Sequence, residues 1–391
     1  MQFTICENVK EIKDSMKVFI ASGDCGKCHN LWTLTVQAFE DSVTFTGVSG
    51  TRVTFRAEVV RPGKYAVCAE DLVNAVKSIE GVPSFDFRDD KEHTVNMTEA
   101  DGFSRNIGSW TDTTVSGEEV KYNREIYLSL DGGAVVEAIK AVKHAASDDE
   151  SKYAMTGVNF DFSGLVPDDM DGSKIYAIAT DGRRLAWSVA GEIPAGVSGI
   201  IPKDNISVKG AIASFIAERA SKSYPVTFRV SAVVEKTQYR EDITRYCSVD
   251  FGRFHIVGAE INRDFPEWRR VIPSASVMNS EFTLAPDFVK ESDRISKTVN
   301  NKYKKIVVTV NGEVVTLDSD IAKQVLKSAT NVSGFSMFDR FAINVNYLRE
   351  AVKAAGKSVV RFQMVDKGRP ILATVGDGAS GSVIMPMNLD C

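Results

Sequence analysis

The chain repeats one unit six times: a short strand-like segment runs directly into an amphipathic, helix-like segment. The six starts are FTICENVKEI, YAVCAEDLVNAV, YLSLDGGAVVEAI, GIIPKDNISVKGAI, FTLAPDFVKES and FAINVNYLREAV. Further strand-like segments follow each start, with the alternating apolar pattern of sheets. One such unit cannot bury its own apolar face, so the recurrence predicts a repeat architecture in which neighbouring units share a core.

The 391 residues are too many for one ordinary core, since a domain usually holds ~100–200 residues. Pairing the six units in chain order predicts three domains, over 1–122, 123–276 and 277–391. Each domain is expected to be α+β, with two helices packed on antiparallel sheets. The helices are predicted over 7–21, 69–79, 132–146, 206–222, 287–299 and 345–355.

Each predicted helix turns one apolar face inward and leaves at least one Lys or Arg on another face. These residues are Lys10, Lys13, Lys17, Lys77, Lys140, Lys143, Arg219, Lys222, Lys290, Arg294, Lys297 and Lys353. Taken singly, such stripes are most often solvated faces. If the six stripes line one surface, they would instead meet phosphates without reading bases.

The formal net charge is −5, from 47 basic and 52 acidic residues. A protein that grips DNA tightly from one face is more often basic overall. An acidic DNA-binding protein must therefore concentrate positive charge locally or hold DNA by topology.

Cys25, Cys28 and His29 have the C-x-x-C-H spacing of haem attachment, and C-x-x-C also suits redox or zinc chemistry. Haem attachment needs an exported protein, and the charged N-terminal segment does not read as a signal peptide. A zinc site needs a second ligand pair, and His93, His144 and His255 are isolated in sequence. The motif therefore predicts reduced loop thiols, with no metal and no cofactor.

An enzyme is the rival class. No nucleophile–base motif and no glycine-rich phosphate loop is present in the sequence. Asp161 and Asp181, on neighbouring predicted strands, could mimic a catalytic carboxylate pair. Asp181 is better explained as the cap of a tight D-G turn. We predict a non-enzymatic protein. No apolar run approaches the ~18 residues needed to span a bilayer, and we expect a cytoplasmic location with no membrane partner.

Four blocks carry a resemblance to a known family. They are GVNFDFSG with KIYAIATDGRRLAWS, then DFPEWRRVIP, then FAINVNYLREAV with GRPIL, and finally SVIMPMNL. In this order and spacing, the blocks resemble bacterial DNA polymerase sliding clamps, the β subunit of the replicative polymerase holoenzyme. The resemblance covers roughly residues 150–390, while residues 1–120 match in pattern only. The chain reads as a divergent relative, and a host or phage origin is left open.

The resemblance implies a head-to-tail homodimeric ring that encircles double-stranded DNA without sequence preference, with helices lining the hole. Such a clamp is a non-catalytic processivity factor. A clamp loader opens it, and the replicative DNA polymerase and repair proteins dock peptide motifs into one pocket per subunit. The alternative is a monomeric clamp-like decoy that binds replication proteins without encircling DNA.

The pocket is carried over onto matching positions, where Leu, Val, Met and Pro would form an apolar groove with a polar rim. These positions are Lys152, Ala154, Thr180, Gly182, Arg183, Leu185, Pro266, Arg270, Val271, Asn344, Tyr347, Pro370, Val383, Met385, Pro386 and Met387. The resemblance also implies DNA contacts by Lys27, Lys152 and Tyr153. Asp390, just after the last block, would disfavour acidic peptides.

Overall fold

The computed structural model describes most of the chain. The described residues are 1–25, 33–88, 94–111, 123–167, 170–201, 204–236, 241–261, 263–299, 302–335, 339–376 and 378–389. No helix among them is long and apolar enough to cross a membrane. Lys27, Cys28, His29, His93 and Asp390 lie outside the described residues.

The chain forms two compact units. Unit 1 holds Met1–Gly133, Ile200–Pro202 and Ser214–Glu260, and unit 2 holds Ala134–Gly199, Lys203–Ala213 and Ile261–Cys391. Each unit is described by itself. The division into three domains stays a prediction.

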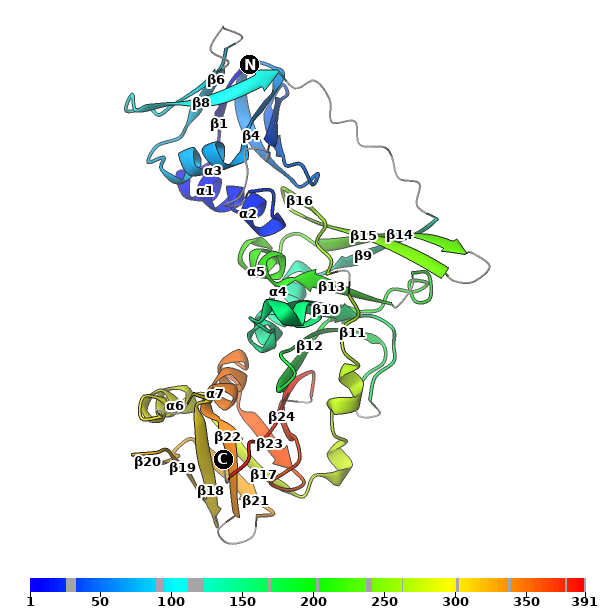
Figure 1. Ribbon diagram of the computed structural model, residues 1–391, viewed down its shortest axis with the longest axis vertical. Helices are drawn as coiled ribbons and strands as arrows, with labels where there is room; N and C mark the ends of the chain where they lie inside the picture. The colour runs from blue at the N-terminus through cyan, green and yellow to red at the C-terminus, as the bar shows by residue number, and fades with distance from the viewer. Residues whose placement is uncertain are drawn as a thin grey trace. The chain divides into compact units, whose positions relative to one another are not determined.

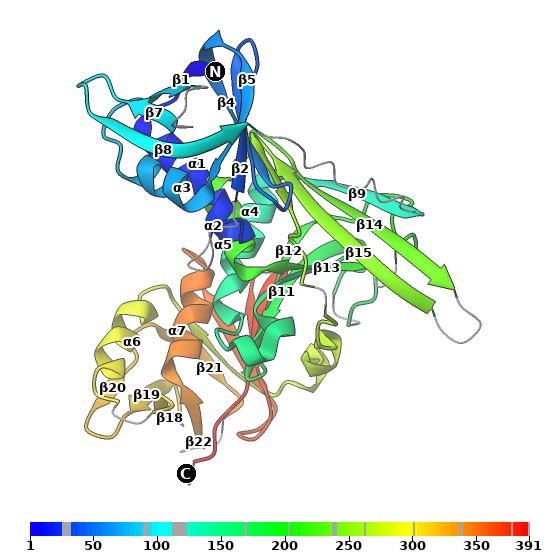
Figure 2. The same ribbon diagram turned by 45° about the horizontal axis from the view of Figure 1, so that its top comes forward.

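Unit 1 is built on one 12-stranded sheet with the order β1-β6-β7-β8-β5-β2-β3-β4-β16-β15-β14-β9. β1 also pairs with β4, which closes the first eight strands of this order on themselves. The long strands β14 and β15 run side by side at the other end (Figure 2). The strands are β1 Gln2–Ile5, β2 Thr33–Ala38, β3 Ser42–Thr46, β4 Arg52–Arg61, β5 Gly63–Cys68, β6 Ser84–Phe87, β7 Thr94–Thr98, β8 Ser104–Thr111, β9 Arg124–Leu130, β14 Val226–Lys236, β15 Glu241–Phe251 and β16 Phe254–Val257.

Phenylalanines fill the core of the closed part of this sheet. Phe3 stacks on Phe85 with 5.0 Å between ring centroids, and Phe45 meets Phe55 edge to face at 5.9 Å. All four are at most 1 % exposed. They alternate with polar residues along their strands, which is the period-2 pattern that the sequence shows.

Two helical segments replace the single helix predicted over 7–21. α1 (Val9–Met16) begins at Asn8, whose side chain accepts from the Glu11 amide at 2.9 Å. α2 (Val18–Ser22) follows after Lys17 and ends at Gly23, whose φ of 88° favours glycine. α1 packs against α3 (Ala69–Lys77), and Figure 1 shows the three helices together beside the sheet.

Unit 2 contains a 9-stranded sheet, ordered β13-β10-β11-β12-β25-β24-β23-β17-β21, and a 4-stranded sheet, ordered β20-β19-β18-β22. The pairing of β12 with β25 joins segments about 200 residues apart into one continuous sheet. The strands are β10 Gly157–Asp161, β11 Lys174–Thr180, β12 Arg184–Glu192, β13 Asn205–Lys209, β17 Ser280–Leu284, β18 Lys305–Asn311, β19 Val314–Asp318, β20 Lys323–Val325, β21 Ala329–Ser333, β22 Asp339–Asn344, β23 Val360–Met364, β24 Ile371–Val375 and β25 Ser380–Ile384.

The helices α6 and α7 pack against each other in unit 2 (Figure 1). Phe288 and Leu348 from these helices join Phe282, Phe341 and Phe362 from the strands in one buried apolar cluster. With α6 and α7 included, the described helical segments after α3 are α4 Gly132–Val142, η1 Lys143–Ala145, η2 Glu150–Met155, α5 Gly210–Arg219, η3 Trp268–Val271, η4 Ala275–Val277, α6 Phe288–Ser296 and α7 Val345–Ala354.

The predicted α+β class is confirmed, and each of the six predicted starts is a strand followed by a helix. All strand pairings between the described strands are antiparallel. The helix predicted over 206–222 begins too early, because residues 205–209 form β13. Ile206 and Val208 alternate with polar residues, and β10 offers a partner edge in register, so strand pairing prevails over the helical pattern.

Candidate functional site

The turn between β11 and β12 is held by its own side chains. Asp181 Oδ1 accepts from the backbone N–H groups of Arg183 at 2.8 Å and Arg184 at 3.0 Å. Thr180 Oγ1 donates to the Arg184 carbonyl at 2.6 Å. The φ of Gly182 is 85°, a backbone conformation that residues other than glycine rarely adopt. The predicted capping role of Asp181 is confirmed, and the turn leaves the Arg183 side chain exposed.

Arg184 ties this turn to α7. Its guanidinium forms ion pairs with Asp181, at 3.0 Å, and with Glu350 of α7. It also lies 4.4 Å from the centre of the Tyr347 ring, in cation–π geometry. The Arg184 side chain is only 13 % exposed, so these partners replace most of its hydration. The result is a fixed spacing between the turn and the start of α7.

Lys152 supports the same turn. Its Nζ donates to the Asp181 carbonyl at 2.8 Å. The sequence predicts Lys152 both in the pocket and against DNA, and the structure gives its ammonium this backbone partner. Tyr153, its neighbour in η2, is 47 % exposed.

The segment after β25 leaves the sheet and crosses to β22. The Met385 N–H donates to the Arg183 carbonyl at 2.9 Å, and the Met387 N–H donates to the Ala342 carbonyl at 2.7 Å. Pro386, between them, has no N–H to extend a ladder. This crossing places Met385, Pro386 and Met387 between the turn and the 4-stranded sheet.

α7 begins at Asn344, whose side chain accepts from the Asn346 amide at 2.9 Å. Tyr347, in the first turn of α7, is half-buried, and this burial raises the pKa of its phenol.

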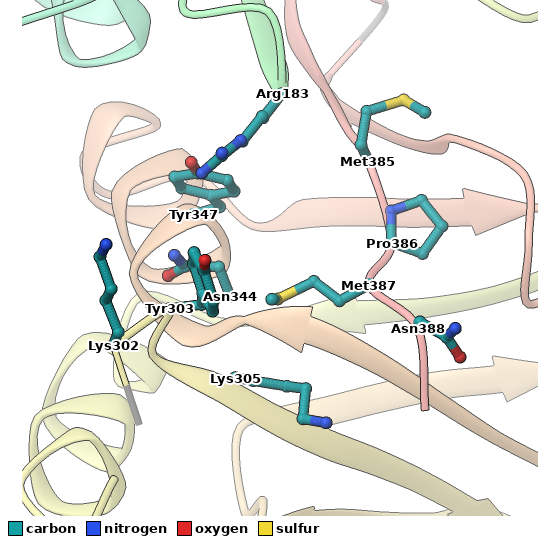
Figure 3. A pocket seen from close by; sticks show the side chains of 10 residues that line it. All are labelled: Arg183, Lys302, Tyr303, Lys305, Asn344, Tyr347, Met385, Pro386, Met387 and Asn388. Atoms are coloured by element: carbon teal, nitrogen blue, oxygen red, sulfur yellow. The ribbon is translucent and has the colours of Figure 1, made fainter. Parts of the chain in front are cut away.

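These elements surround a pocket of about 680 Å³ within unit 2 (Figure 3). The Met387 side chain points across it toward Tyr303 and Asn344, and Arg183 reaches toward Tyr347. This volume lies within the range of about 300–1,000 Å³ that is typical of ligand pockets. The pocket is lined by Arg183, Lys302, Tyr303, Lys305, Asn344, Tyr347, Met385, Pro386, Met387 and Asn388.

Six of the lining residues match the sequence prediction: Arg183, Asn344, Tyr347, Met385, Pro386 and Met387. Lys302, Tyr303, Lys305 and Asn388 were not predicted. The pairing of β18 with β22 sets Lys305 opposite Asn344 and so brings the start of β18 and the residues before it to the pocket, whereas Asn388 follows Met387 along the chain. The sequence does not disclose that register.

The other predicted pocket residues do not line this pocket. Leu185 and Val383 are opposite each other in the β12–β25 pair and belong to a buried cluster with Trp268. Their exposure is 3 % and 2 %, so both pack in the core. Of the predicted centre Leu185, Val271 and Met385, only Met385 lines the pocket. The remaining positions are Lys152, Ala154, Thr180, Gly182, Pro266, Arg270, Val271 and Pro370, of which Val271 is 45 % exposed.

Most of the predicted DNA-facing residues are exposed on the described helices. Unit 1 carries Lys10, Lys13 and Lys17 on or beside α1, Lys77 on α3, Arg219 on α5 and Lys222 after it. Unit 2 carries Lys140 on α4, Lys143 on η1, Lys290, Arg294 and Lys297 on or beside α6, and Lys353 on α7.

Arg219 has a different environment from the others. Its guanidinium forms ion pairs with Glu11 and Asp14 of α1, and its side chain is 17 % exposed. The charge is thus largely neutralised within unit 1, and Arg219 is better described as a support of α1. Lys17 also pairs with Asp14, at 2.6 Å, but remains exposed.

Among the described residues, we find no cluster of side chains typical of a catalytic carboxylate pair or of a metal site. Asp161 Oδ2 accepts from the Trp268 indole at 2.8 Å and pairs with Arg269, so this carboxylate is engaged in packing. No group of three or more His, Cys, Asp or Glu among the described residues could hold a metal ion. Cys25 is a free thiol, and burial raises its pKa.

The closed and continuous antiparallel sheets, the six strand–helix starts and the pocket at the T-D-G turn define a class. The chain has the fold of the bacterial sliding clamps. Solved sliding clamps match this chain over their whole length. A clamp from Bartonella birtlesii, solved bound to griselimycin, matches with a TM-score of 0.75 and 18 % identity, over 99 % of this chain and 100 % of that one. The Caulobacter crescentus polymerase III β protein matches with a TM-score of 0.74 and 20 % identity, over 100 % of both chains.

Among curated proteins, the chain is similar to the beta sliding clamp of Synechocystis. The identity is 24 % over 275 residues, which is 67 % of this chain and 65 % of that relative. The matched region thus spans just under two thirds of the relative's length. No protein-family model matches the chain. The resemblance predicted from the sequence is confirmed at the level of the fold.

Proposed function

We propose that this chain is a DNA sliding clamp, a non-catalytic processivity factor that encircles duplex DNA and tethers a replicative DNA polymerase. The observation that carries the proposal is the correspondence of the whole chain, from end to end, with solved sliding clamps. A shared fold alone does not define a function. The pocket at the T-D-G turn adds a site of the chemistry that a tethering protein needs.

The pocket would serve as the tether. Met385, Pro386 and Met387 give it an apolar wall, and Tyr347 adds an aromatic face with a polar tip. Methionine adapts to partners of different shape, so one pocket suits several docking peptides. The proposed occupants are short motifs of the polymerase, the clamp loader and other replication or repair proteins.

The basic helix faces would contact DNA. We propose that two chains form a head-to-tail ring, each with three domains over 1–122, 123–276 and 277–391, and that the helices line the hole. Exposed Lys and Arg side chains would meet phosphates, so binding would be weak, sensitive to salt and independent of sequence. The chain's net charge of −5 suits holding by topology, with the positive charge that would meet DNA supplied locally by these helix faces. We place the clamp in the cytoplasm.

Two measurements test this proposal. Light scattering should give twice the mass of the chain, whereas the decoy alternative requires a monomer. After loading by a clamp loader, the protein should stay on nicked circular DNA in high salt and slide off the same DNA once it is linearised. Equal loss from circular and linear DNA would refute topological holding.

A further inference from the structure

Two methionines stand in the wall of the pocket, on the segment that crosses from β25 to β22. Met385 is 41 % exposed, and Met387 is half-buried with its side chain across the cavity (Figure 3). Both line the pocket, one on each side of Pro386. A thioether is soft and adaptable, which suits docking, but it is also a group that oxidants convert into a polar sulfoxide.

Met385 is the most exposed methionine in the part of the chain that the structure describes. The buried methionines, at 3 % exposure or less, are Met1, Met16, Met97 and Met364, and the half-buried ones are Met155, Met170, Met278 and Met387. Met337 lies outside the described residues. Because an oxidant in solution must reach the sulfur, it should modify Met385 before the other described methionines.

The backbone beside the two thioethers is held independently of their side chains. The Met385 N–H donates to the Arg183 carbonyl at 2.9 Å, and the Met387 N–H donates to the Ala342 carbonyl at 2.7 Å. Neither methionine belongs to the buried apolar clusters of unit 2 described above. A sulfoxide at either position should therefore change the chemistry of the wall and leave the fold in place.

We propose that Met385 and Met387 make peptide docking sensitive to oxidation by hydroperoxides such as hydrogen peroxide. The oxidised wall carries S–O dipoles, which a docked apolar anchor would have to strip of water, so the peptide is released. A methionine sulfoxide reductase would reverse the change. This inference rests on the proposed function and adds a regulation of its pocket.

The chemical step balances with the peroxide as the only co-reactant. A sulfur lone pair attacks one peroxide oxygen and forms the S–O bond, while the O–O bond breaks. The second oxygen keeps the electron pair of the broken bond, takes up the proton of the transferred oxygen and leaves as water. Sulfur is thereby oxidised and the peroxide is reduced.

The test treats the full-length protein with hydrogen peroxide and then with dithiothreitol, which restores reversibly oxidised thiols and leaves sulfoxides. Mass spectrometry of proteolytic fragments should show that Met385 gains oxygen first. Fluorescence anisotropy with a labelled peptide that carries a Leu-Phe anchor gives the affinity before and after treatment. Once both wall methionines are oxidised, binding should be roughly 5–20-fold weaker, and methionine sulfoxide reductase should restore it.

M385L/M387L replaces both thioethers by apolar side chains of similar volume that peroxide does not oxidise. Whatever the starting affinity of this variant, peroxide treatment should change it by less than about twofold. M278L is the matched control, since Met278 is a half-buried methionine of unit 2 that does not line the pocket. Treatment should weaken peptide binding by M278L as much as it weakens binding by the wild type.

An equal loss in M385L/M387L would assign the effect to another group and overturn the inference. Unchanged affinity of the wild type with both methionines oxidised would also overturn it, as would oxidation of Met278 ahead of Met385. If the untreated protein failed to bind the peptide, the docking role itself would fall and the inference with it, although the order of oxidation would still be measurable.

Discussion

The pocket gathers ten side chains from four segments of unit 2 around one cavity of about 680 Å³. The basic residues of the helix faces are spread over several helices and, with the exception of Arg219, are mostly exposed. At the pocket, Arg184 fixes the β11–β12 turn and contacts the Tyr347 ring. On the helices, no lysine side chain is held in place by another lysine. One substitution should therefore damage the pocket, while the helix faces should respond only to several together.

Replacing Arg184 should have the largest effect. R184M leaves the Asp181 and Glu350 carboxylates without their shared partner, which should cost about 3 kcal/mol of unfolding free energy. It should also weaken peptide binding at least tenfold, because the turn is no longer fixed against α7. Urea unfolding and peptide titration measure the two effects.

Arg349→Met is the control for this substitution. Arg349 also joins two elements, through Asp293 at 2.8 Å, but the pair is far more exposed, at 30 % and 47 %. Exposed pairs contribute about 0–1 kcal/mol. Equal destabilisation by the two variants would show that Arg184 has no special role at the pocket.

A substitution of Glu99 tests a buried ion pair of unit 1 in the same way. Its carboxylate accepts from Arg105 at 2.8 Å and from the amides of Glu80 and Gly81, and these bonds hold its pKa at about 2, below the usual 4.5. The stabilisation is present above about pH 4.5 and is lost as the pH falls toward 2. E99Q should cost about 2 kcal/mol at pH 7 and progressively less below pH 4, as read from unfolding midpoints.

E99Q should leave peptide affinity unchanged, since Glu99 and the pocket lie in different units. If the difference in unfolding free energy between E99Q and wild type stayed constant from pH 7 to pH 3, the charge of Glu99 would not be what stabilises the segment around Glu80 and Gly81.

Met387 tests the pocket wall itself. Its side chain points across the cavity, so M387A removes apolar contact area that a peptide anchor would cover. The expected loss is about tenfold in peptide affinity, or ~1.4 kcal/mol, with little change in stability because Met387 is only half-buried. Val359→Ala, at a 54 % exposed position outside the pocket, should bind peptide as the wild type does. Matching affinities of the two variants would move the docking site elsewhere.

The way in which the pocket is assembled from separate segments also explains which of its residues could be predicted from the sequence. Arg183, Asn344 and Met385 lie in short blocks whose sequences resemble those of sliding clamps, and the resemblance carried the pocket prediction onto them. Lys302 and Lys305 reach the pocket through the register of β18 on β22, which depends on contacts across the fold. Leu185 is followed by the apolar residues Ala186 and Trp187, and an apolar side chain suits a pocket wall as well as a core, so its sequence could not decide between the two.

The smallest single effects belong to the helix faces. Lys10 and Lys13 on α1 have no ion-pair partner among the described residues, unlike Lys17 and Arg219. Each should contribute about one phosphate contact, so K10Q/K13Q should lower the slope of log affinity against log salt by about 2, and either change alone by about 1. Lys64→Gln, on strand β5 of the same unit, is the control and should leave the slope unchanged. The slope comes from equilibrium binding to short linear duplex DNA, which the protein can leave, at rising salt. A slope that K64Q lowers as much as K10Q/K13Q would show that the charge acts through the total and not through a lining of helices.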